Sequence, residues 1–200
     1  MLSHEKAVLR IGKYLLGTRT RGIVYKPDKS KGLECYVDAN FAGEWSQADA
    51  ENAENVMSRT GYIIMYANCP IHFVSKLQTE IALSTAEAEY IALSQALREV
   101  IPLMTLLKEI NKTFPVTLGA PDFVCTVHED NQSCIKMAQS HRFTPRTKHI
   151  ALKYHHFRSF VKAKRVTITY CRTELQKADL LTKPLSDALF FRLRSMVLGW

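Results

Sequence analysis

Long apolar runs and a signal-peptide pattern are both missing from this sequence, so we expect neither a membrane span nor a secretion signal within it. We find no apolar run that approaches the roughly 18–20 residues needed to cross a bilayer. The N-terminal segment MLSHEKAVLRIGKYLLGT is charged and amphipathic, and it lacks the apolar centre of a signal peptide. These absences predict an intracellular chain that is not associated with a membrane.

Cysteine pairs, internal repeats and low-complexity tracts are also missing. The five cysteines are odd in number, widely spaced and never in a CxxC pair, so we expect buried free thiols rather than disulfides or a zinc site. A length of 200 residues with 46% hydrophobic residues is enough for one proper core. We therefore expect one principal globular domain.

Acidic residues are missing from one long segment. Between Asn131 and Thr173 there is no Asp or Glu but there are ten Lys and Arg residues, whereas the rest of the chain has 17 basic and 19 acidic residues. Aromatic residues such as Phe143 and Tyr154 are interspersed, a composition that suits a nucleic-acid backbone. A solvated basic helix face is the alternative. We assign phosphate contacts to Arg142, Arg146, Lys148, Lys153, Arg158 and Lys162.

Hydrophobic periodicity predicts an α/β chain. Strand patterns occur at 33–41, 60–68, 70–78, 122–130 and 165–172, the second and third forming a hairpin across Asn68-Cys69-Pro70. Helical patterns occur at 5–17, 84–110, 131–140, 147–164, 173–183 and 187–200. In the 173–183 helix, Thr173 and Gln176 have the spacing of a capping box. Because helices separate the later strands, those strands should run parallel within a mixed sheet flanked by helices.

The helix expected at 84–110 carries two glutamates, Glu87 and Glu89, that must lie on different faces. Helical steps from Glu89 land on apolar residues throughout: Ala92, Leu93, Ala96, Leu97 and Val100. Steps from Glu87 begin with Tyr90 and Ile91 but continue to polar residues, so that face suits water. Glu89 is therefore predicted to be buried against the sheet, where an ionised carboxylate is costly unless a cation meets it.

Three further acids stand at element ends where they could join Glu89. Asp38 lies near the end of the first strand, Asp130 ends the fourth, and Asp179 lies in the helix at 173–183. Neighbouring strands are about 4.8 Å apart, so acids on them can share a site. Carboxylate oxygens suit Mg²⁺ or Mn²⁺. Two such ions about 3.5–4 Å apart can activate a water and stabilise the leaving oxygen of a phosphodiester.

Each acid also has a purely structural explanation. Asp130 could cap the following helix, Asp179 could complement a helix dipole, and Asp38 could be a turn residue. Glu89 could be a partly exposed helix residue, although the face on which it lies argues against this. The metal site is therefore a hypothesis about the four acids as a group.

Six segments of the sequence resemble one family. They are YVDANFAG (36–43), SRTGYII (58–64), KLQTEIALSTAEAEYIALSQALRE (76–99), EDNQSCIKMA (129–138), RTKHIALKYHHFR (146–158) and QKADLLTKPL (176–185). In this order they are similar to the ribonuclease H domain of copia-type retrotransposon polyproteins. Residues 4–25 resemble the end of the preceding reverse transcriptase region. We therefore expect 1–32 to be the end of that region or a connection segment, and 33–200 to be a ribonuclease H-like domain with a C-terminal helical extension.

The resemblance implies a fold, an activity and a location. The fold would be that of ribonuclease H, with a five-stranded mixed sheet, and the activity would be cleavage of the RNA strand of RNA–DNA hybrids with two Mg²⁺ or Mn²⁺ ions. The implied partners are the hybrid and the reverse transcriptase of the same polyprotein. The implied location is the cytoplasm, within a virus-like particle.

The resemblance also assigns roles to the four acids. If these acids act as the matching acids of the family do, Asp38 would bridge both ions, and Glu89 and Asp130 would hold the first ion. Asp179 would help the second ion to position the attacking water. Glu129 departs from the family pattern and adds a charge beside Asp130. Two further departures are Asn40 and Ala151, which stand where an acid is common. His149, His155 and His156 could contact phosphate or assist product release, but packed or solvated helix histidines are more common.

Two other functions are compatible with the resemblance. One is a non-catalytic nucleic-acid-binding module of the same fold, and the complete set of four acids argues against it. The other is a DNA-cutting integrase or transposase of the same superfold. That class usually has three acids and a different final motif, so Asp179 within KADLLTKPL argues against it.

Overall fold

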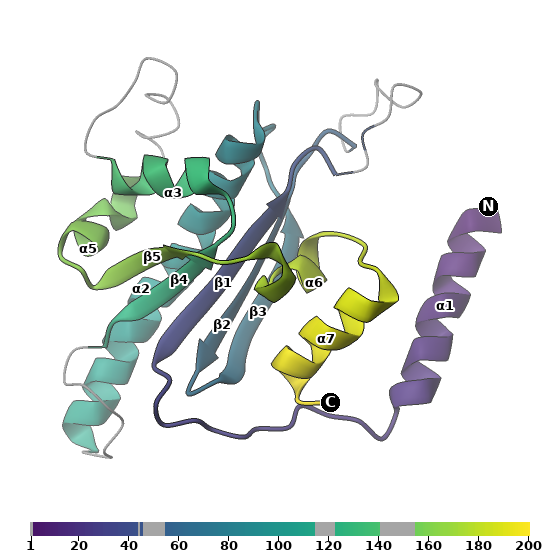
Figure 1. Cartoon of the computed structure of the whole chain (residues 1–200), viewed down its shortest axis with the longest axis horizontal. Helices are drawn as coiled ribbons and strands as arrows, with labels where there is room; N and C mark the ends of the chain where they lie inside the picture. The colour runs from purple at the N-terminus through teal and green to yellow at the C-terminus, as the bar shows by residue number, and fades with distance from the viewer. Residues whose placement is uncertain (1, 44, 46–54, 115–122, 141–154) are drawn as a thin grey trace.

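One five-stranded sheet forms the centre of the molecule (Figure 1). The structure is a computed structural model that describes residues 2–43, 45, 55–114, 123–140 and 155–200. The strands are β1 (Leu33–Asn40), β2 (Arg59–Tyr66), β3 (Cys69–Leu77), β4 (Cys125–Glu129) and β5 (Val166–Tyr170), in the order β3-β2-β1-β4-β5. The first three are antiparallel, whereas β4 runs parallel to β1 and to β5. The predicted mixed sheet with parallel later strands is confirmed.

Helices cover both faces of the sheet. One face packs against α2 (Thr85–Thr113), α3 (Gln132–Gln139), the 3-10 turn η2 (His155–Phe157) and α5 (Arg158–Lys162), around the larger apolar core. The other packs against α6 (Asp179–Thr182) and α7 (Asp187–Leu198), which follow the 3-10 turn η3 (Thr173–Leu175). In Figure 1, α2 lies behind the sheet and α6 and α7 lie in front of it. The five cysteines are buried, as expected.

The buried face of α2 agrees with the prediction. Glu89 is 3% exposed, and every apolar residue predicted to share its face is buried. The prediction for the other face is only partly right, because Tyr90, Ile91 and Ser94 are buried as well. The Tyr90 ring lies 5.5 Å from the ring of Phe157, so η2 covers this side of the first turns.

Glu87 has a local structural role at the start of α2. Its backbone N–H donates to Oγ of the N-cap residue Ser84, and its Oε2 accepts from the N–H of Leu83. These reciprocal bonds satisfy backbone donors that the first helical turn leaves free. Of the two glutamates, Glu87 therefore caps the helix and Glu89 is the one carried into the interior.

The length and composition of α2 are those of a helix that could cross a membrane, contrary to the expectation that no run in the chain is long and apolar enough. Its most apolar 18-residue window is 50% buried inside the protein, as in the core helix of a globular domain. The window lies on the helix that covers the centre of the sheet.

Two local predictions are wrong. The hairpin turn consists of Ala67 and Asn68, whose φ angles are 49° and 62°, and Cys69 already belongs to β3. A two-residue turn with positive φ matches the twist of the two strands better than the predicted three-residue connection. The capping box at 173–183 does not form, because the segment folds as η3 and a separate α6, and Gln176 donates to backbone carbonyls of the sheet instead.

The N-terminal helix α1 (Leu2–Thr18) stands beside α7 and away from the sheet (Figure 1). The rings of Tyr14 and Phe190 meet edge to face at 6.0 Å. The apolar side of α1 is otherwise largely open, since Val8, Ile11 and Leu15 are 66%, 60% and 60% exposed. The division of the chain at residues 32 and 33 stays a prediction.

Residues after α1 pair with the C-terminal end of the chain. The N–H of Val24 donates to the carbonyl of Leu198 at 2.9 Å, and Trp200 Nε1 donates to the carbonyl of Gly22 at 2.7 Å. Gly199 has φ of 84°, and a Cβ there would lie 2.9 Å from Cβ of Val24. The two segments are therefore in close contact.

Candidate metal centre

Strand order and strand direction bring Asp38 and Asp130 together. On β1, Tyr36 contributes to the core under α6, and Asp38 lies two residues further on the same side of the strand. Asp130 directly follows β4, which pairs in parallel with β1 so that Tyr36 is opposite His128. Both acids therefore lie at the same end of the sheet, as predicted, with Asp38 1% exposed.

Gly61 lets α6 approach the sheet closely enough to add the third acid. It lies in β2 directly opposite Asp38. A Cβ at this position would lie 2.5 Å from Cγ2 of Thr182 and 2.9 Å from Cβ of Leu181. Because no side chain separates them, the backbone of α6 packs directly on the strand. This packing holds Asp179 beside Asp38.

A buried glutamine fixes the segment that leads into α6. Gln176 is fully buried, and its Nε2 donates to the carbonyl of Val37 at 2.9 Å and to that of His128 at 3.2 Å. Its Oε1 accepts from the N–H of Ala178 at 3.3 Å. The side chain thus ties β1 and β4 to the start of α6, one residue before Asp179.

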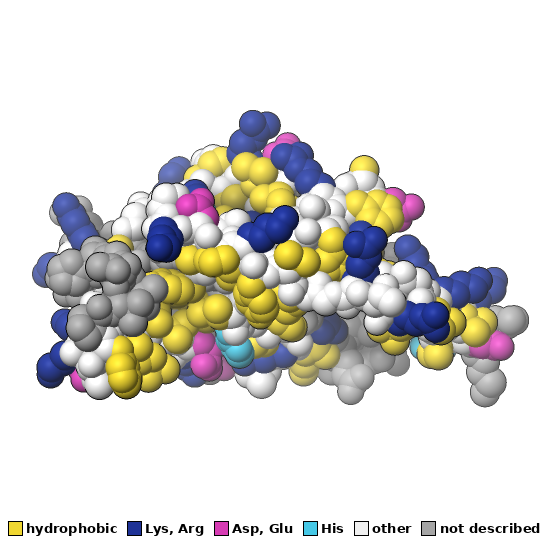
Figure 2. All heavy atoms as spheres, turned by 90° about the horizontal axis from the view of Figure 1, so that it is seen from below, with side chains coloured by type: hydrophobic (Ala, Val, Ile, Leu, Met, Phe, Trp, Pro, Cys, Tyr) yellow, Lys and Arg dark blue, Asp and Glu magenta, His cyan; other side chains and the backbone are white. Residues whose placement is uncertain are grey.

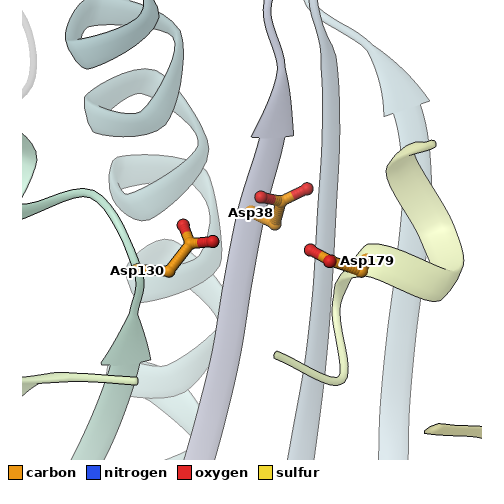
Figure 3. A group of neighbouring side chains, drawn as sticks. All are labelled: Asp38, Asp130 and Asp179. Carbon is orange, nitrogen blue, oxygen red and sulfur yellow. The ribbon is translucent and has the colours of Figure 1, made fainter. Parts of the chain in front are cut away.

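Asp38, Asp130 and Asp179 form one group (Figure 3). One carboxylate oxygen from each lies within 4.8 Å of the others. Figure 3 shows Asp38 between the other two, with the carboxylate of Asp179 turned toward it. The hydroxyl of Thr182 donates to Oδ2 of Asp38, and that of Thr173 donates to Oδ2 of Asp130 at 3.2 Å. These hydrogen bonds orient the two carboxylates.

Glu89 belongs to a second group, with Glu129 and Asp130. One carboxylate oxygen from each of these three also lies within 4.8 Å of the others. Glu129 is 0% exposed, and its Oε1 accepts from the N–H of Asn131 at 3.0 Å. Asp130 is the acid common to both groups, whereas the resemblance assigned that position to Asp38. The four acids identified from the sequence do converge, and Glu129 joins them as a fifth.

Among the described residues, Lys183 is the cation that pairs with the acids of the site. Its Nζ lies 3.0 Å from Oδ1 of Asp179 and 3.5 Å from Oδ1 of Asp38. Burial alone would lower the pKa of Lys183, but the two carboxylates outweigh that effect and raise it. The lysine is therefore charged at neutral pH and balances part of the negative charge on the α6 side.

Burial and the charge of neighbouring carboxylates raise the pKa of Asp38, Asp179, Glu89 and Glu129. Burial followed by the charge of Asp38 raises the pKa of Asp179 to about 6. Burial is also the main cause of the raised pKa of Asp38, which Lys183 and Thr182 oppose. The pKa values of Glu89 and Glu129 are raised well above the ordinary range by burial, and neighbouring carboxylates add to the effect. Ionised acids at this density require a cation.

The residues present fit divalent metal ions. All five acids offer hard oxygen ligands, the set that Mg²⁺ and Mn²⁺ prefer. Oε2 of Glu89 and Oε2 of Glu129 are buried and accept no hydrogen bond from the described residues. A cavity of about 420 Å³ opens in front of the acids and is lined by Asp38, Asn40, Phe41, Glu89, Asp130 and Lys183, among others. Solvent and a phosphate group can therefore reach the carboxylates of Asp38, Glu89 and Asp130.

The predicted nucleic-acid contacts are only partly within the described residues. Arg142, Arg146, Lys148, Lys153 and His149 lie outside them, as does the side chain of His155. Lys162 is exposed on α5. Arg158 is half-buried, and its Nη2 donates to the carbonyl of Met137 at 3.2 Å, so part of its guanidinium serves the fold. His156 is exposed and meets the ring of Phe157 edge to face.

The face seen in Figure 2 gives no concentrated basic surface. Lys and Arg side chains lie singly there among hydrophobic ones, as far as the described residues show. The phosphate-binding surface stays a prediction for the segment between Asn131 and Thr173.

Three residues that shape the site were missed in the sequence. Lys183 and Thr182 follow Asp179 by four and three positions, the spacing that places helix residues on one face. Gly61 is a single glycine inside a strand pattern, which is a known sign of close backbone approach. The helical spacing and the glycine within a strand were visible in the sequence, but neither pattern indicates which distant residue would be contacted.

Sequence comparison identifies relatives among retrotransposon polyproteins, although no family model matches the chain. The chain is 32% identical over 187 residues to the "Retrovirus-related Pol polyprotein from transposon RE2" of Arabidopsis thaliana, which covers 94% of this chain and 12% of that protein. It is 34% identical over 180 residues to the corresponding polyprotein from transposon TNT 1-94 of Nicotiana tabacum, covering 90% of this chain and 12% of that protein. The chain thus spans a small part of these relatives.

Among solved structures, LC11-RNase H1 in complex with RNA/DNA hybrid matches with a TM-score of 0.49 and 16% identity, covering 75% of this chain and 93% of that one. The sheet order, with its antiparallel first three strands and parallel last two, is the mixed five-stranded sheet that the resemblance implies. The chain is homologous to a region of the Pol polyproteins of copia-type retrotransposons, and its fold is that of a ribonuclease H.

Proposed function

We propose that this chain is a metal-dependent endonuclease that hydrolyses the RNA strand of RNA–DNA hybrids during retrotransposon reverse transcription. The observation that carries the proposal is the convergence of Asp38, Glu89, Asp130 and Asp179 at one end of the sheet, beside an open cavity. These acids come from two strand ends and two helices that are far apart in the sequence. Stability alone does not favour such crowding of buried charge.

The acids would bind two ions in two overlapping groups. Asp38, Asp130 and Asp179 would hold one ion, and Glu89 with Asp130 would hold the second. When bound, the ions supply Lewis-acid stabilisation of the phosphate and a more acidic water. Thr182 and Gln176 keep Asp38 and Asp179 in place before substrate arrives. Hydrolysis joins a water oxygen to phosphorus, breaks the P–O3′ bond and passes a proton to O3′, which leaves a 3′-hydroxyl and a 5′-phosphate.

Recognition of the hybrid would use the basic segment between Asn131 and Thr173. Its lysines and arginines would track phosphates, and contacts across the shallow minor groove to 2′-hydroxyls would distinguish RNA from DNA. Lys162 is suited to phosphate contact because it is exposed. Arg158 is less suited, because its guanidinium already contacts the Met137 carbonyl.

The second proposed partner is the reverse transcriptase of the same polyprotein. The chain covers 12% of the polyproteins that it resembles, and α1 has an exposed apolar side that includes Val8, Ile11 and Leu15. Packing of this side against the preceding region would remove it from water. Within the virus-like particle implied by the resemblance, this contact would keep cleavage close to DNA synthesis.

Cleavage assays with the purified chain test the proposal. We would incubate it with labelled RNA–DNA hybrid, duplex DNA and single-stranded RNA, each with Mg²⁺, Mn²⁺ or EDTA. The expected result is cleavage of the RNA strand of the hybrid alone, abolished by EDTA. Cleavage of duplex DNA would favour a DNA-cutting nuclease, and binding without cleavage would favour a catalytically lapsed module.

The variant Asp38→Asn tests the site. It should remove cleavage and leave hybrid binding largely intact, because the basic segment is unchanged. Asp28→Asn is the matched control, since it removes the same charge from an exposed loop residue. An Asp38→Asn protein that still cut at the parental rate would refute the assignment of the acids.

The basic segment is tested through the salt dependence of binding. Replacing Lys153 and Lys162 together by Gln should weaken hybrid binding and reduce the slope of log affinity against log salt by up to roughly 2. Lys112→Gln is the control, because this exposed lysine lies at the far end of α2. An unchanged slope in the double variant would count against this surface.

A further inference from the structure

Glu129 is the acid for which the four-acid site provides no role. It is fully buried at the end of β4, and a carboxylate oxygen of it lies within 4.8 Å of ligand oxygens of Glu89 and Asp130. One oxygen, Oε1, is satisfied by the N–H of Asn131. The other, Oε2, is buried and has no hydrogen-bond partner among the described residues.

Glu89 also has a buried carboxylate oxygen without a hydrogen-bond partner among the described residues. This oxygen is Oε2, and the residue is 3% exposed. Two carboxylates thus face the same small region, each with an oxygen that nothing in the described chain satisfies. The cost of such a group is about 1–3 kcal/mol even when it is uncharged, and more when it is charged.

The described residues place no Lys or Arg in an ion pair with the acids on this side. Lys183 pairs with Asp38 and Asp179, and no ion pair of Glu89 or Glu129 occurs within the described residues. The thiol of Cys134 is within hydrogen-bonding reach of Glu129 and lowers its pKa slightly against the effect of burial, but a thiol is a weak, uncharged donor that cannot balance a carboxylate. What would satisfy the two free oxygens at once is a positive charge located between them and Asp130.

We propose that Glu129 is a metal ligand, so that Glu89, Glu129 and Asp130 form a three-carboxylate site for one divalent cation, Mg²⁺ or Mn²⁺. The inference deepens the proposed function, because it completes the ligand set of the ion on the α2 side. Three carboxylates leave about three positions of an octahedral ion for water or phosphate oxygens. Asp38 and Asp179 are then available for the other ion, with Asp130 between the two.

This arrangement predicts that the α2-side ion binds without nucleic acid. Its three protein ligands are already gathered, and two of them are buried and held from the backbone through Asn131 and Ala39. Preorganised ligands lose little conformational freedom on binding. The ion on the α6 side must instead displace Lys183 from the two carboxylates that it contacts.

The experiment is a titration of the intact chain with Mn²⁺ alone, followed by electron paramagnetic resonance of the free ion. The variants are Glu129→Gln, which keeps the shape and the acceptor for Asn131, and Glu34→Gln as control. Glu34 lies on β1 of the same sheet, its side chain is 13% exposed, and it pairs with His128 rather than with the site acids. Glu129→Gln should lower the affinity of the tightest site on the order of tenfold or more, and Glu34→Gln should leave it unchanged.

Thermal unfolding gives an independent measure. Without metal, at a pH high enough to ionise Glu129, Glu129→Gln should unfold at a higher temperature than the parent, because it removes a carboxylate from a group of buried acids. It should also gain less stability from Mn²⁺. Glu129→Asp keeps the charge at shorter reach and should recover part of the affinity. Parental or tighter Mn²⁺ binding by Glu129→Gln, or no recovery in Glu129→Asp, overturns the proposal.

The cleavage assay separates this inference from the proposed function. Loss of cleavage in Asp38→Asn with parental metal binding in Glu129→Gln means that the function stands and the role of Glu129 falls. If Glu129→Gln weakens metal binding but the parent chain does not cut the hybrid, the role of Glu129 as a metal ligand stands and the proposed function falls.

Discussion

Buried negative charge is balanced differently on the two sides of Asp130, the α6 side with Asp38 and Asp179 and the α2 side with Glu89 and Glu129. On the α6 side, Asp38 and Asp179 share the ammonium of Lys183, and Asp38 also accepts from the hydroxyl of Thr182. On the α2 side, Glu89 and Glu129 have buried oxygens with no hydrogen bond and no ion pair among the described residues. The oxygens of Asp179 are also without a hydrogen bond, but one of them lies 3.0 Å from Lys183. A bound cation should therefore stabilise the α2 side most, whereas on the α6 side one cation replaces another.

The largest effect is expected from breaking the α6 side at Gly61. Gly61→Val should push α6 off β2, because even a Cβ would lie 2.5 Å from Thr182, and it should move Asp179 away from Asp38. Misplacement of about 1 Å can cost about a hundredfold in rate, so hybrid cleavage should fall at least about that far. Steady-state cleavage rates measure the loss.

The same variant should leave the α2 side intact. Its tightest Mn²⁺ site should keep parental affinity, since α6 supplies no ligand there. Gly32→Ala is the control, because nothing lies within 4 Å of a Cβ at Gly32. Equal loss of cleavage in both glycine variants would remove the argument from close packing.

The pH dependence of stability tests whether the acids are charged and crowded. The pKa of Asp179 is raised from 3.8 to about 6, so the folded state binds more protons than the unfolded state in this range, and stability falls as pH rises through it. Glu89 and Glu129 act in the same direction at higher pH. For Asp179 alone the loss is at most about 3 kcal/mol.

Denaturant unfolding at about pH 5 and about pH 7, with and without Mg²⁺, measures this effect. Without metal the chain should be less stable at the higher pH, and the stabilisation by Mg²⁺ should be greater there. Glu34 acts in the opposite direction, because the hydrogen bond from His128 lowers its pKa, but only below its ordinary value of 4.5. A metal-free chain that gains stability from pH 5 to pH 7 would contradict the crowding of ionised acids.

Removing the built-in cation should sharpen the contrast between the two sides. Lys183→Gln eliminates the competitor on the α6 side, so the weaker Mn²⁺ site should bind more tightly, by up to about tenfold for two partly screened ion pairs. The tightest site should be unaffected. Calorimetric titration distinguishes the two, and Lys112→Gln, roughly 35 Å along α2 from Glu89, controls for net charge. Weaker binding at the second site would mean that Lys183 supports that ion.

The smallest effect is expected at the start of α2. Ser84→Ala removes the N-cap acceptor for the N–H of Glu87 and should lower the free energy of unfolding by about 1 kcal/mol. Metal affinity should change little, because Glu89 is held by packing through the rest of the helix. Ser3→Ala in α1 is the control for the substitution. A large loss of Mn²⁺ affinity in Ser84→Ala would show that the cap, rather than the core, positions Glu89.

Patterns local to one element could be predicted from the sequence. The apolar steps from Glu89 identified the buried face of α2, because a helix repeats every 3.6 residues wherever it packs. Asp38 and Asp130 could be expected to share a site because each lies near the end of a strand, and neighbouring strands are about 4.8 Å apart. The convergence of Asp38, Glu89, Asp130 and Asp179 could therefore be predicted, whereas their role as metal ligands stays a prediction.

Features that depend on contacts between distant segments could not be predicted. The strand pattern of β4 does not show that Glu129 turns inward beside Glu89, since the end of a strand can point to either face. Gln176 was assigned to a capping box because its spacing is correct, but carbonyls of β1 and β4 compete for its amide and bind it instead. The approach of Thr182 to Gly61 joins residues more than a hundred positions apart.

The pairing of residues 22–24 with the C-terminal end has a practical consequence. A shortened chain that began at Leu33, where the sequence suggests a boundary, would lose the hydrogen bonds from Val24 to Leu198 and from Trp200 to Gly22. The last turn of α7, which includes buried Val197, would then be free to fray. A fragment for expression should start upstream of Gly22, so that the hydrogen bonds between residues 22–24 and the C-terminal end are kept.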